Sequence, residues 1–252
     1  MIKGIYSFAG LNVLILSNYS FVHDFMEEYR TISKSIDFTV VVNEQEIYKE
    51  QQFLRELGPE DEYIDSKCRP ENAERIVVLK KIAEQALDYD IILYHGSVIA
   101  VNNEAYMFTA NSGTGKSTHV KLWRELLGDK SVMVNDDKPL IKIKQDKAIA
   151  YGTPYNGKHH LGNDIGVPLK AVAVIYQAEE NIIEEIDKKA AYPMLYKHVY
   201  HPEDKVKLLK TMDLLNRMVK NISIYKLGCN MDISAAELAW KTMRGNEYEA
   251  KK

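Results

Sequence analysis

Residues 109–123 read TANSGTGKSTHVKLW, and this stretch decides the fold of the chain. It has the form of a phosphate-binding loop leading into a helix, where exposed backbone N–H groups wrap a polyphosphate. The usual pattern is G-x-x-x-x-G-K-[ST], and Ala110 stands where its first glycine is expected. Gly113 adds a flexible position inside the loop. We therefore expect the phosphate cradle to be retained, with a slightly different entry.

The residues of this loop have separate expected roles. Lys116 is expected to reach the β- and γ-phosphates of ATP, and the Ser117 hydroxyl to ligate Mg²⁺. Thr118 is a secondary candidate. The other candidates for nucleotide binding are Asn111, Ser112, Gly113, Thr114 and Gly115. The alternative is a flexible turn before an amphipathic helix, but the strand–loop–helix context favours nucleotide binding.

Hairpins surround the loop on both sides. Two β-type runs, DIILYHGSVIAV and AYMFTA, are separated by Asn102-Asn103-Glu104, which is a hairpin signature. After the helix KSTHVKLWRELLG, three further strands are expected at SVMVN, PLIKIK and AIAYGTP. Most enzymes with such a loop have a parallel sheet of βαβ units. This pattern instead predicts an α/β fold with a mixed, largely antiparallel sheet.

Residues 1–88 are expected to form an accessory α/β portion before a catalytic portion at 89–252. IKGIYSF and LNVLILS flank an Ala9-Gly10 turn, a helix is predicted over FVHDFMEEYRTI, and FTVVVNE reads as a strand. The charged stretch that follows, with Pro59 and Pro70, predicts an irregular connection before a helix over ERIVVLKKIAEQALDY. The pattern is compatible with a separate domain and with strands that join the main sheet.

An acidic pair follows the loop helix. The segment VMVNDDKPL is an apolar strand that delivers Asp136 and Asp137 at its C-terminal end, where carboxylates can bind the Mg²⁺ of a nucleotide. One aspartate can organise the metal while the other accepts a proton from the attacking hydroxyl. We lean to Asp136 as the base and Asp137 as the metal ligand. The alternative is a solvated turn that caps a hairpin.

Four histidines and a lysine are weaker candidates. His95 is expected to end an apolar strand beside the loop strand. It then either faces the γ-phosphate or the acceptor, or is a half-buried structural histidine. Lys158, in the loop GTPYNGKHH, suits charge neutralisation on a transferring phosphoryl group. His159 and His160 are adjacent and cannot both point inward from an extended chain, which disfavours a metal site there. His119, on the loop helix, is expected at a packing or surface position.

The order HGS-x-I-A-V, SGTGKST and N-D-D resembles the catalytic domain of the bacterial HPr serine kinase/phosphorylase family. It is also similar to ATP-dependent phosphoenolpyruvate carboxykinase, which shares that fold and whose loop also reads SGTGK. The combination SGTGKSTH-x-K-LW, NDDKPL and YGTP-Y-x-GK is most similar to stand-alone HPr kinase-like proteins. The resemblance covers about residues 90–178.

The resemblance implies a kinase core of the carboxykinase and HPr kinase type. It implies that Lys116 and Ser117 handle ATP and Mg²⁺, that Asp136 and Asp137 are metal ligand and base, and that His95 lies beside the transferred phosphate. The arginine- and glycine-rich signature after the acidic pair is absent, so HPr as substrate and the reverse phosphorolysis do not follow. A carboxykinase would need a much longer chain and arginines for its dicarboxylate.

Bulk composition excludes other classes. The net charge is −3, so no global field draws the chain to nucleic acid or to anionic lipid. No stretch approaches the ~18 apolar residues of a membrane helix, and no signal peptide is evident. The two cysteines, Cys68 and Cys229, lack metal-ligand or redox spacing. We expect a cytoplasmic protein that binds neither nucleic acid nor membranes.

The predicted function is an ATP-dependent, Mg²⁺-requiring kinase. Its acceptor is expected to be a hydroxyl, first of all Ser or Thr of a peptide or small protein. The alternatives are a kinase for a small molecule, such as free serine or another alcohol, and a regulatory nucleotide-binding module without transfer activity. The C-terminal part, with AAYPMLYKHVY and KVKLLKTMDLLNRMV, suits packing, a partner groove or a homo-oligomer interface.

Overall fold

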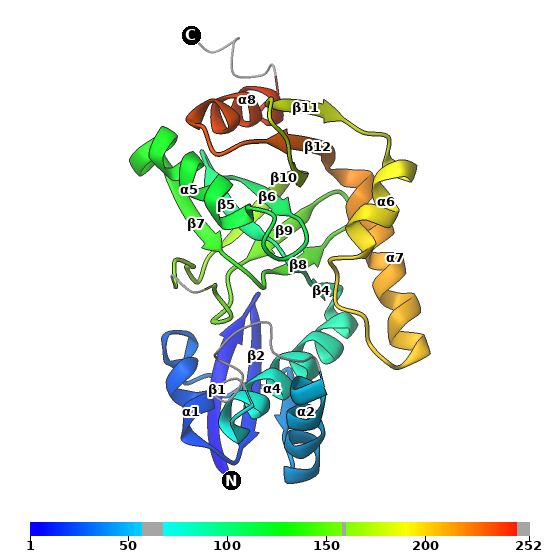
Figure 1. The fold of residues 1–252 in the computed structure, drawn as a ribbon. Helices are drawn as coiled ribbons and strands as arrows, with labels where there is room; N and C mark the ends of the chain where they lie inside the picture. The colour runs from blue at the N-terminus through cyan, green and yellow to red at the C-terminus, as the bar shows by residue number, and fades with distance from the viewer. Residues whose placement is uncertain (57–67, 158–159, 246–252) are drawn as a thin grey trace. The chain divides into compact units, whose positions relative to one another are not determined.

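The computed structural model describes residues 1–56, 68–157 and 160–245. The chain divides into two compact units, Met1–Asp88 and Tyr89–Lys252 (Figure 1).

The sheet of the first unit begins with the predicted hairpin. Strands β1 (Ile2–Phe8) and β2 (Leu11–Ser17) pair antiparallel around Ala9 and Gly10. Both turn residues have positive φ, 51° and 78°, as a tight two-residue hairpin turn requires. Strand β3 (Phe38–Val41) adds parallel to β2. The hairpin and the third strand therefore lie where the sequence pattern predicts them.

The helix predicted over FVHDFMEEYRTI is shorter than expected. Helix α1 spans Ser20–Phe25, a 3₁₀ turn covers Glu27–Tyr29, and Arg30 is extended. Arg30 makes an isolated antiparallel bridge with Tyr6, and the N–H of Thr31 donates to the carbonyl of Ile5 at 2.9 Å. The chain leaves the helix because its backbone pairs with β1 instead.

The connection predicted to be irregular contains a helix. Helix α2 spans Glu44–Glu56 and packs against α4 (Pro70–Ala86), while residues 57–67 lie outside the described part of the chain. Asn43 and Glu46 form a reciprocal capping box, in which each side chain accepts the other's backbone N–H at 3.0 Å. This capping box was a helix-start signal that the high charge of the segment obscured.

The second unit is built on a nine-stranded sheet, with the path β4-β8-β9-β10-β6-β5-β7 and with β12 beside β10 and β11. Its strands are β4 (Ile91–Leu93), β5 (Ser97–Val101), β6 (Glu104–Thr109), β7 (Ser131–Asn135), β8 (Leu140–Ile143), β9 (Ala148–Tyr151), β10 (Gly166–Gln177), β11 (Ile182–Glu185) and β12 (Ser223–Cys229). In the described residues, β10 runs parallel to β6 and β12, and the other pairs are antiparallel. The prediction of a mixed sheet is confirmed.

Strand direction brings three strand ends to one edge of this sheet. β6 and β10 are parallel, and β7 runs in the same direction because β5 is antiparallel to both β6 and β7. The chain therefore leaves the sheet at this edge after Thr109, Asn135 and Gln177. Strand β5 starts there, at Ser97. Ligands of open α/β sheets bind outside such carboxyl ends.

The helices of the second unit pack in two groups (Figure 1). They are α5 (Lys116–Leu127), α6 (Lys188–Tyr196), α7 (Lys205–Asn221) and α8 (Ile233–Met243). Helices α5 and α8 pack on each other and against strands, with Trp123 completely buried between Tyr106, Phe108 and Trp240. Helix α6 packs on α7, which contacts β4 and β8. This aromatic core thus holds in place α5, the helix that follows the predicted phosphate loop.

None of the helices in the described part of the chain combines the length and the apolar composition that a membrane crossing needs. Cys68 and Cys229 are free thiols, and one belongs to each unit.

Candidate functional site

The predicted phosphate loop connects β6 to α5. Gly113 and Gly115 have φ of 75° and 116°, a region that favours glycine, and Gly115 is the residue before the first turn of α5. The N–H of Thr114 donates to the carbonyl of Asn111 at 3.3 Å, which closes the turn. The loop backbone therefore bends sharply into a helix N-terminus, where N–H groups and the helix dipole favour an anion.

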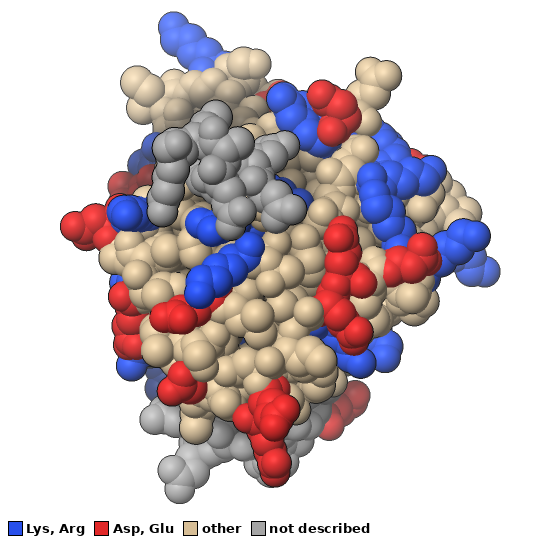
Figure 2. All heavy atoms as spheres, turned by 90° about the horizontal axis from the view of Figure 1, so that it is seen from above, with Lys and Arg blue, Asp and Glu red and all other residues tan. Residues whose placement is uncertain are grey.

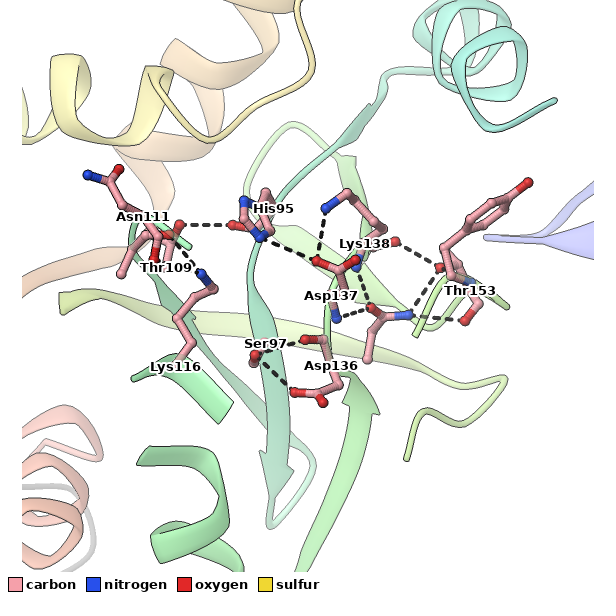
Figure 3. A network of polar contacts seen from close by, with 12 residues as sticks. His95, Ser97, Thr109, Asn111, Lys116, Asp136, Asp137, Lys138 and Thr153 are labelled. Atoms are coloured by element: carbon pink, nitrogen blue, oxygen red, sulfur yellow. Dashed lines mark hydrogen bonds and ion pairs between the residues drawn. The ribbon is translucent and has the colours of Figure 1, made fainter. Parts of the chain in front are cut away.

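Lys116 folds back along the start of the loop. Its ammonium donates to the carbonyls of Ala110 and Asn111 at 2.8 and 3.3 Å (Figure 3). Burial lowers the pKa of this amine, and the negative charge of Asp137 opposes part of that shift. The ammonium thus lies at the beginning of the loop, on the side of the acidic pair.

The turn that carries the acidic pair is shaped by Asn135. Its side-chain oxygen accepts the N–H groups of Asp137 and Lys138 at 2.9 and 2.7 Å, which is an Asx turn. Its amide nitrogen donates to the carbonyl and hydroxyl oxygens of Thr153, both at 3.1 Å. The Thr153 hydroxyl in turn donates to the carbonyl of Lys138 at 2.8 Å. Asn135 and Thr153 thereby fix the backbone that presents both aspartates.

Asp137 lies in a half-exposed group with His95 and Lys138. One carboxylate oxygen is 3.3 Å from Nε2 of His95 and 2.8 Å from Nζ of Lys138 (Figure 3). Burial raises the pKa of Asp137, but the hydrogen bonds and charges of His95 and Lys138 outweigh it and hold this pKa below its ordinary value. Asp137 is therefore a carboxylate at neutral pH.

Asp136 is more deeply placed, with 6% of its surface exposed. The hydroxyl of Ser97 contacts its backbone carbonyl at 3.0 Å and its carboxylate at 3.1 Å. Gly157 passes so close that a Cβ there would lie 2.8 Å from the other carboxylate oxygen. The two aspartates are thus held by different partners, in different degrees of burial.

The loop and the acidic pair line one cavity of about 460 Å³. Its loop residues are Ser112, Gly113, Gly115, Lys116, Ser117 and Thr118. Across from them lie His95, Asp136, Asp137 and Gly157. The sequence candidates from three separate segments therefore meet in one place.

Two further cavities adjoin this central one at opposite ends of the loop. The first, of about 520 Å³, shares Ser112 and Gly113 with it and is also lined by the predicted residues Asn111 and Thr114. The second, also about 520 Å³, shares Ser117, Thr118 and Asp136 with it. We call them the loop-start cavity and the helix-side cavity.

His95 does not end a strand beside the loop strand, as the sequence suggested. The apolar run is split, because β4 ends at Leu93 and pairs with β8, whereas β5 is the neighbour of β6. Between them, the N–H groups of His95 and Gly96 donate to the carbonyls of His198 and Asp137 at 2.7 and 3.0 Å. His95 therefore lies in a connection that is tied to the acidic turn.

His198 is a site residue that sequence reasoning missed. It follows α6, is 8% exposed, lines the loop-start cavity and meets the ring of His95 edge-on with centroids 6.3 Å apart. Burial lowers its pKa to about 4, with contributions from the charges of His95, Lys116 and Lys197. Nothing in its local sequence marks it, because it reaches the site through the fold alone.

The other candidates have different surroundings. His119 packs in the core, 2% exposed, where its Nε2 accepts from the indole of Trp123 at 3.1 Å. Lys158 and His159 lie outside the described residues. His160 is exposed, with φ of 47°.

Oxygen donors suited to Mg²⁺ line the central cavity. Ser117 and the two aspartates all face it. In the described part of the chain, no three His, Cys, Asp or Glu residues are grouped as a metal cage. Carboxylate and hydroxyl oxygens are the kind of ligand that Mg²⁺ takes in proteins.

Charged side chains of both signs are mixed on the face shown in Figure 2. Lys and Arg groups lie beside Asp and Glu groups, with uncharged surface between them. That face therefore presents no extended field of one sign.

Comparison with protein-family models gives no match, and comparison with curated proteins gives none. Among solved structures, the chain is similar to the Hpr(Ser) kinase/phosphatase from Coxiella burnetii. The TM-score is 0.34 at 9% sequence identity, over 61% of this chain and 99% of that chain. This is a distant likeness of structure only.

Proposed function

We propose that the chain is an ATP-dependent, Mg²⁺-requiring kinase that transfers the γ-phosphoryl group to a hydroxyl. The observation that carries this proposal is the central cavity, in which Lys116 and Ser117 of the loop face Asp136 and Asp137. A cation, a hydroxyl that can bind metal and two carboxylates around one cavity are the parts that phosphoryl transfer uses.

The loop binds the phosphates in this proposal. Backbone N–H groups of residues 112–118 surround the phosphates, and Lys116 holds their β/γ end. Ser117 and Asp136 are the residues that would hold Mg²⁺, which supplies charge neutralisation on the phosphate oxygens when bound. Asp136 is assigned here because it lines the helix-side cavity together with Ser117.

The acceptor hydroxyl loses its proton to Asp137. The hydroxyl oxygen forms a bond to the γ-phosphorus, the bond from that phosphorus to the bridging oxygen breaks, and ADP leaves. Asp137 suits the proton because it is ionised and is held by His95 and Lys138 at the other side of the cavity. These contacts favour Asp137 as the base and Asp136 as the metal ligand, which is the reverse of the assignment preferred from the sequence. Both assignments stay predictions. A role for Lys158 stays a prediction.

A binding and transfer experiment tests the proposal. The full-length protein is titrated with ATP at several Mg²⁺ concentrations and then incubated with γ-labelled ATP and a cell extract. We expect Mg²⁺-dependent binding and label in an acceptor. ATP binding without transfer to any fraction would identify a regulatory nucleotide-binding module, and absence of ATP binding would refute the function. The cytoplasmic location, the homo-oligomer and the absence of nucleic-acid and membrane partners stay predictions.

A further inference from the structure

The loop-start cavity is the strongest unassigned feature of the second unit. Its walls come from the beginning of the phosphate loop, from the end of β10 and from the end of α6. The side chain of Gln177 at the end of β10 contacts the carbonyl of Thr114 at 3.5 Å, which links two of these walls. The cavity is therefore formed by three segments that meet at the carboxyl edge of the sheet.

The position of Lys116 gives the loop a direction. Its ammonium contacts the carbonyls of Ala110 and Asn111, both of which line the loop-start cavity. Since the lysine of such a loop reaches the β- and γ-phosphates and Lys116 lines the central cavity, the γ end of ATP belongs in the central cavity, on the side next to the loop-start cavity. The nucleoside then extends the other way, to the helix-side cavity with Val120, Arg124 and Leu161. The loop-start cavity is left for the acceptor.

The wall formed by α6 is held firmly in place. The hydroxyl of the fully buried Tyr94 donates to the carbonyl of Leu195 at 2.9 Å, and the N–H of Tyr200 donates to the carbonyl of Leu93 at 2.9 Å. Together with the bond from His95 to His198, these contacts tie the end of α6 to β4. The cavity is thus largely pre-formed, as small-molecule sites usually are.

The lining has the chemistry of a site for an anion. Among the described residues that line it, Lys197 is the charged side chain, and none is Asp or Glu. Asn111, Gln177 and His198 add neutral hydrogen-bonding groups, and Met194 contributes an apolar side. A volume of about 520 Å³ lies in the range of small-molecule pockets and far exceeds one serine side chain.

We propose that the acceptor is a small alcohol that bears a carboxylate, bound in the loop-start cavity with its carboxylate at Lys197. This inference rests on the proposed kinase function and names its substrate class. The hydroxyl lies towards Asp137 and the γ-phosphate, and the product is the phosphate ester of the acid together with ADP. An amino group on the acceptor would find no carboxylate partner among the described residues that line this cavity.

The acceptor class is tested with a fractionated cell extract. The filtrate of small molecules is separated on an anion exchanger into retained and unretained fractions, and the proteins and peptides are kept as a third fraction. Each fraction is incubated with the full-length protein, Mg²⁺ and γ-labelled ATP. We expect label in compounds of the retained fraction. Transfer only to the unretained fraction or to proteins, or no transfer while Mg·ATP binds, would overturn the inference. Failure of ATP binding would instead refute the proposed function.

Defined alcohols sharpen the test. Lactate and propane-1,2-diol differ chiefly in the carboxylate, as do glycerate and glycerol, and turnover is followed by ADP release. We expect a kcat/KM at least about tenfold higher for the acid of each pair, the usual worth of a charge-assisted contact. Equal values for acid and neutral alcohol in a pair that is turned over would contradict a carboxylate subsite.

A charge variant locates the subsite. Lys197→Gln is expected to raise KM for the acceptor found in the retained fraction about tenfold, with kcat and KM for ATP little changed. The matched control is Lys189→Gln. Lys189 lies near the start of α6, whereas Lys197 follows its end, and Lys189 lines a different groove, between α6 and α7. Arg124→Gln is expected to raise KM for ATP alone. An unchanged acceptor KM in Lys197→Gln would overturn the placement. So would an acceptor KM that rises in Arg124→Gln together with an ATP KM that rises in Lys197→Gln.

Discussion

Each unit holds a polar group centred on a histidine, and the two groups differ in access to solvent. In the unit Met1–Asp88, His23 is 3% exposed, and its ring nitrogens contact the hydroxyls of Tyr6 and Ser17 at 2.6 and 2.8 Å. In the other unit, the side chain of His95 is 33% exposed and contacts Asp137 at the wall of a cavity. The first group is closed and the second is open to a ligand.

This difference separates stability from function. Closed hydrogen bonds among buried atoms stabilise a fold, and the loss of one partner leaves the others unsatisfied. Partly exposed groups beside a cavity can exchange solvent for a ligand at small cost to folding. We expect variants of the open group to lose activity with little change in stability, and variants of the closed group to do the opposite.

The largest effect is expected for Lys116→Ala. The variant loses the cation expected at the β/γ-phosphates, so phosphoryl transfer should fall below detection and ATP affinity should fall clearly. Because the hydrogen bonds of Lys116 within the described part of the chain go to loop carbonyls, the thermal midpoint should stay near that of the wild type. Calorimetric ATP titration, transfer assays and thermal unfolding are measured together. Unchanged affinity and turnover would remove the loop from the mechanism.

The next effect concerns the acidic pair. Asp137→Asn should lower kcat by about 10²–10⁴ while Mg·ATP still binds, because the proton acceptor is lost. Asp136→Asn should bind Mg·ATP poorly and recover in part at high Mg²⁺. Both are followed by turnover and by nucleotide titration at several Mg²⁺ concentrations. The reverse pattern would restore the assignment to which the sequence leant, and two variants like the wild type would make the pair a simple turn.

A smaller effect, on stability alone, is expected in the closed group. His23→Leu removes the histidine partner of the buried Tyr6 hydroxyl and one of the two contacts of the Ser17 hydroxyl, which also donates to the carbonyl of Tyr19, and should reduce the free energy of unfolding by about 2–3 kcal/mol. Tyr6→Phe, the matched variant, removes one hydroxyl and should cost less. Urea unfolding measures both, and Mg·ATP binding under native conditions should be unchanged. A loss of ATP binding by the folded His23→Leu protein would break the separation of the two groups.

The smallest effect is a pH dependence from His119, a closed histidine of the larger unit. Burial lowers its pKa from 6.5 to about 4. Below pH 6.5 the unfolded chain binds the proton more readily, so its contribution to stability is present above that pH and is lost as the pH falls towards 4. At pH 5 the loss is about 1–2 kcal/mol. Unfolding between pH 7 and 5 should therefore show a shallower decline for His119→Leu, and identical slopes would refute this origin.

Local sequence rules account for much of the fold. The Ala9-Gly10 and Asn102-Asn103 turns have positive φ at both residues, so two hairpins were readable from turn chemistry. The glycines of the phosphate loop and the strand before the acidic pair were likewise predicted from local residue patterns. Helix α2 was missed because its composition is polar, although its Asn43–Glu46 capping box was present in the sequence. Helix α1 is short because pairing of Arg30 with Tyr6 overrides the local helical pattern.

The candidate site was less accessible to sequence reasoning. The loop residues, Asp136 and Asp137 do line one cavity, and their chemical roles stay predictions. Asn135 could have been given its turn-forming role, since an asparagine at a strand end readily accepts following N–H groups. His198 and Lys197 could not, because they reach the loop through contacts between the end of α6 and the chain at residues 93–95, which are distant in the sequence. Such non-local placement leaves no mark in the neighbouring residues.

The parallel pairing of β10 with β12 has a consequence for synthesis on the ribosome. Strand β6 is made before β10, so one partner is already available when β10 emerges, but the other partner, Ser223–Cys229, is translated only after α6 and α7. Until then the nascent chain carries an open strand edge at Val172 and Ile175, a surface that invites pairing with other chains. Aggregation through this edge is therefore a hazard of the interval between the synthesis of the two strands.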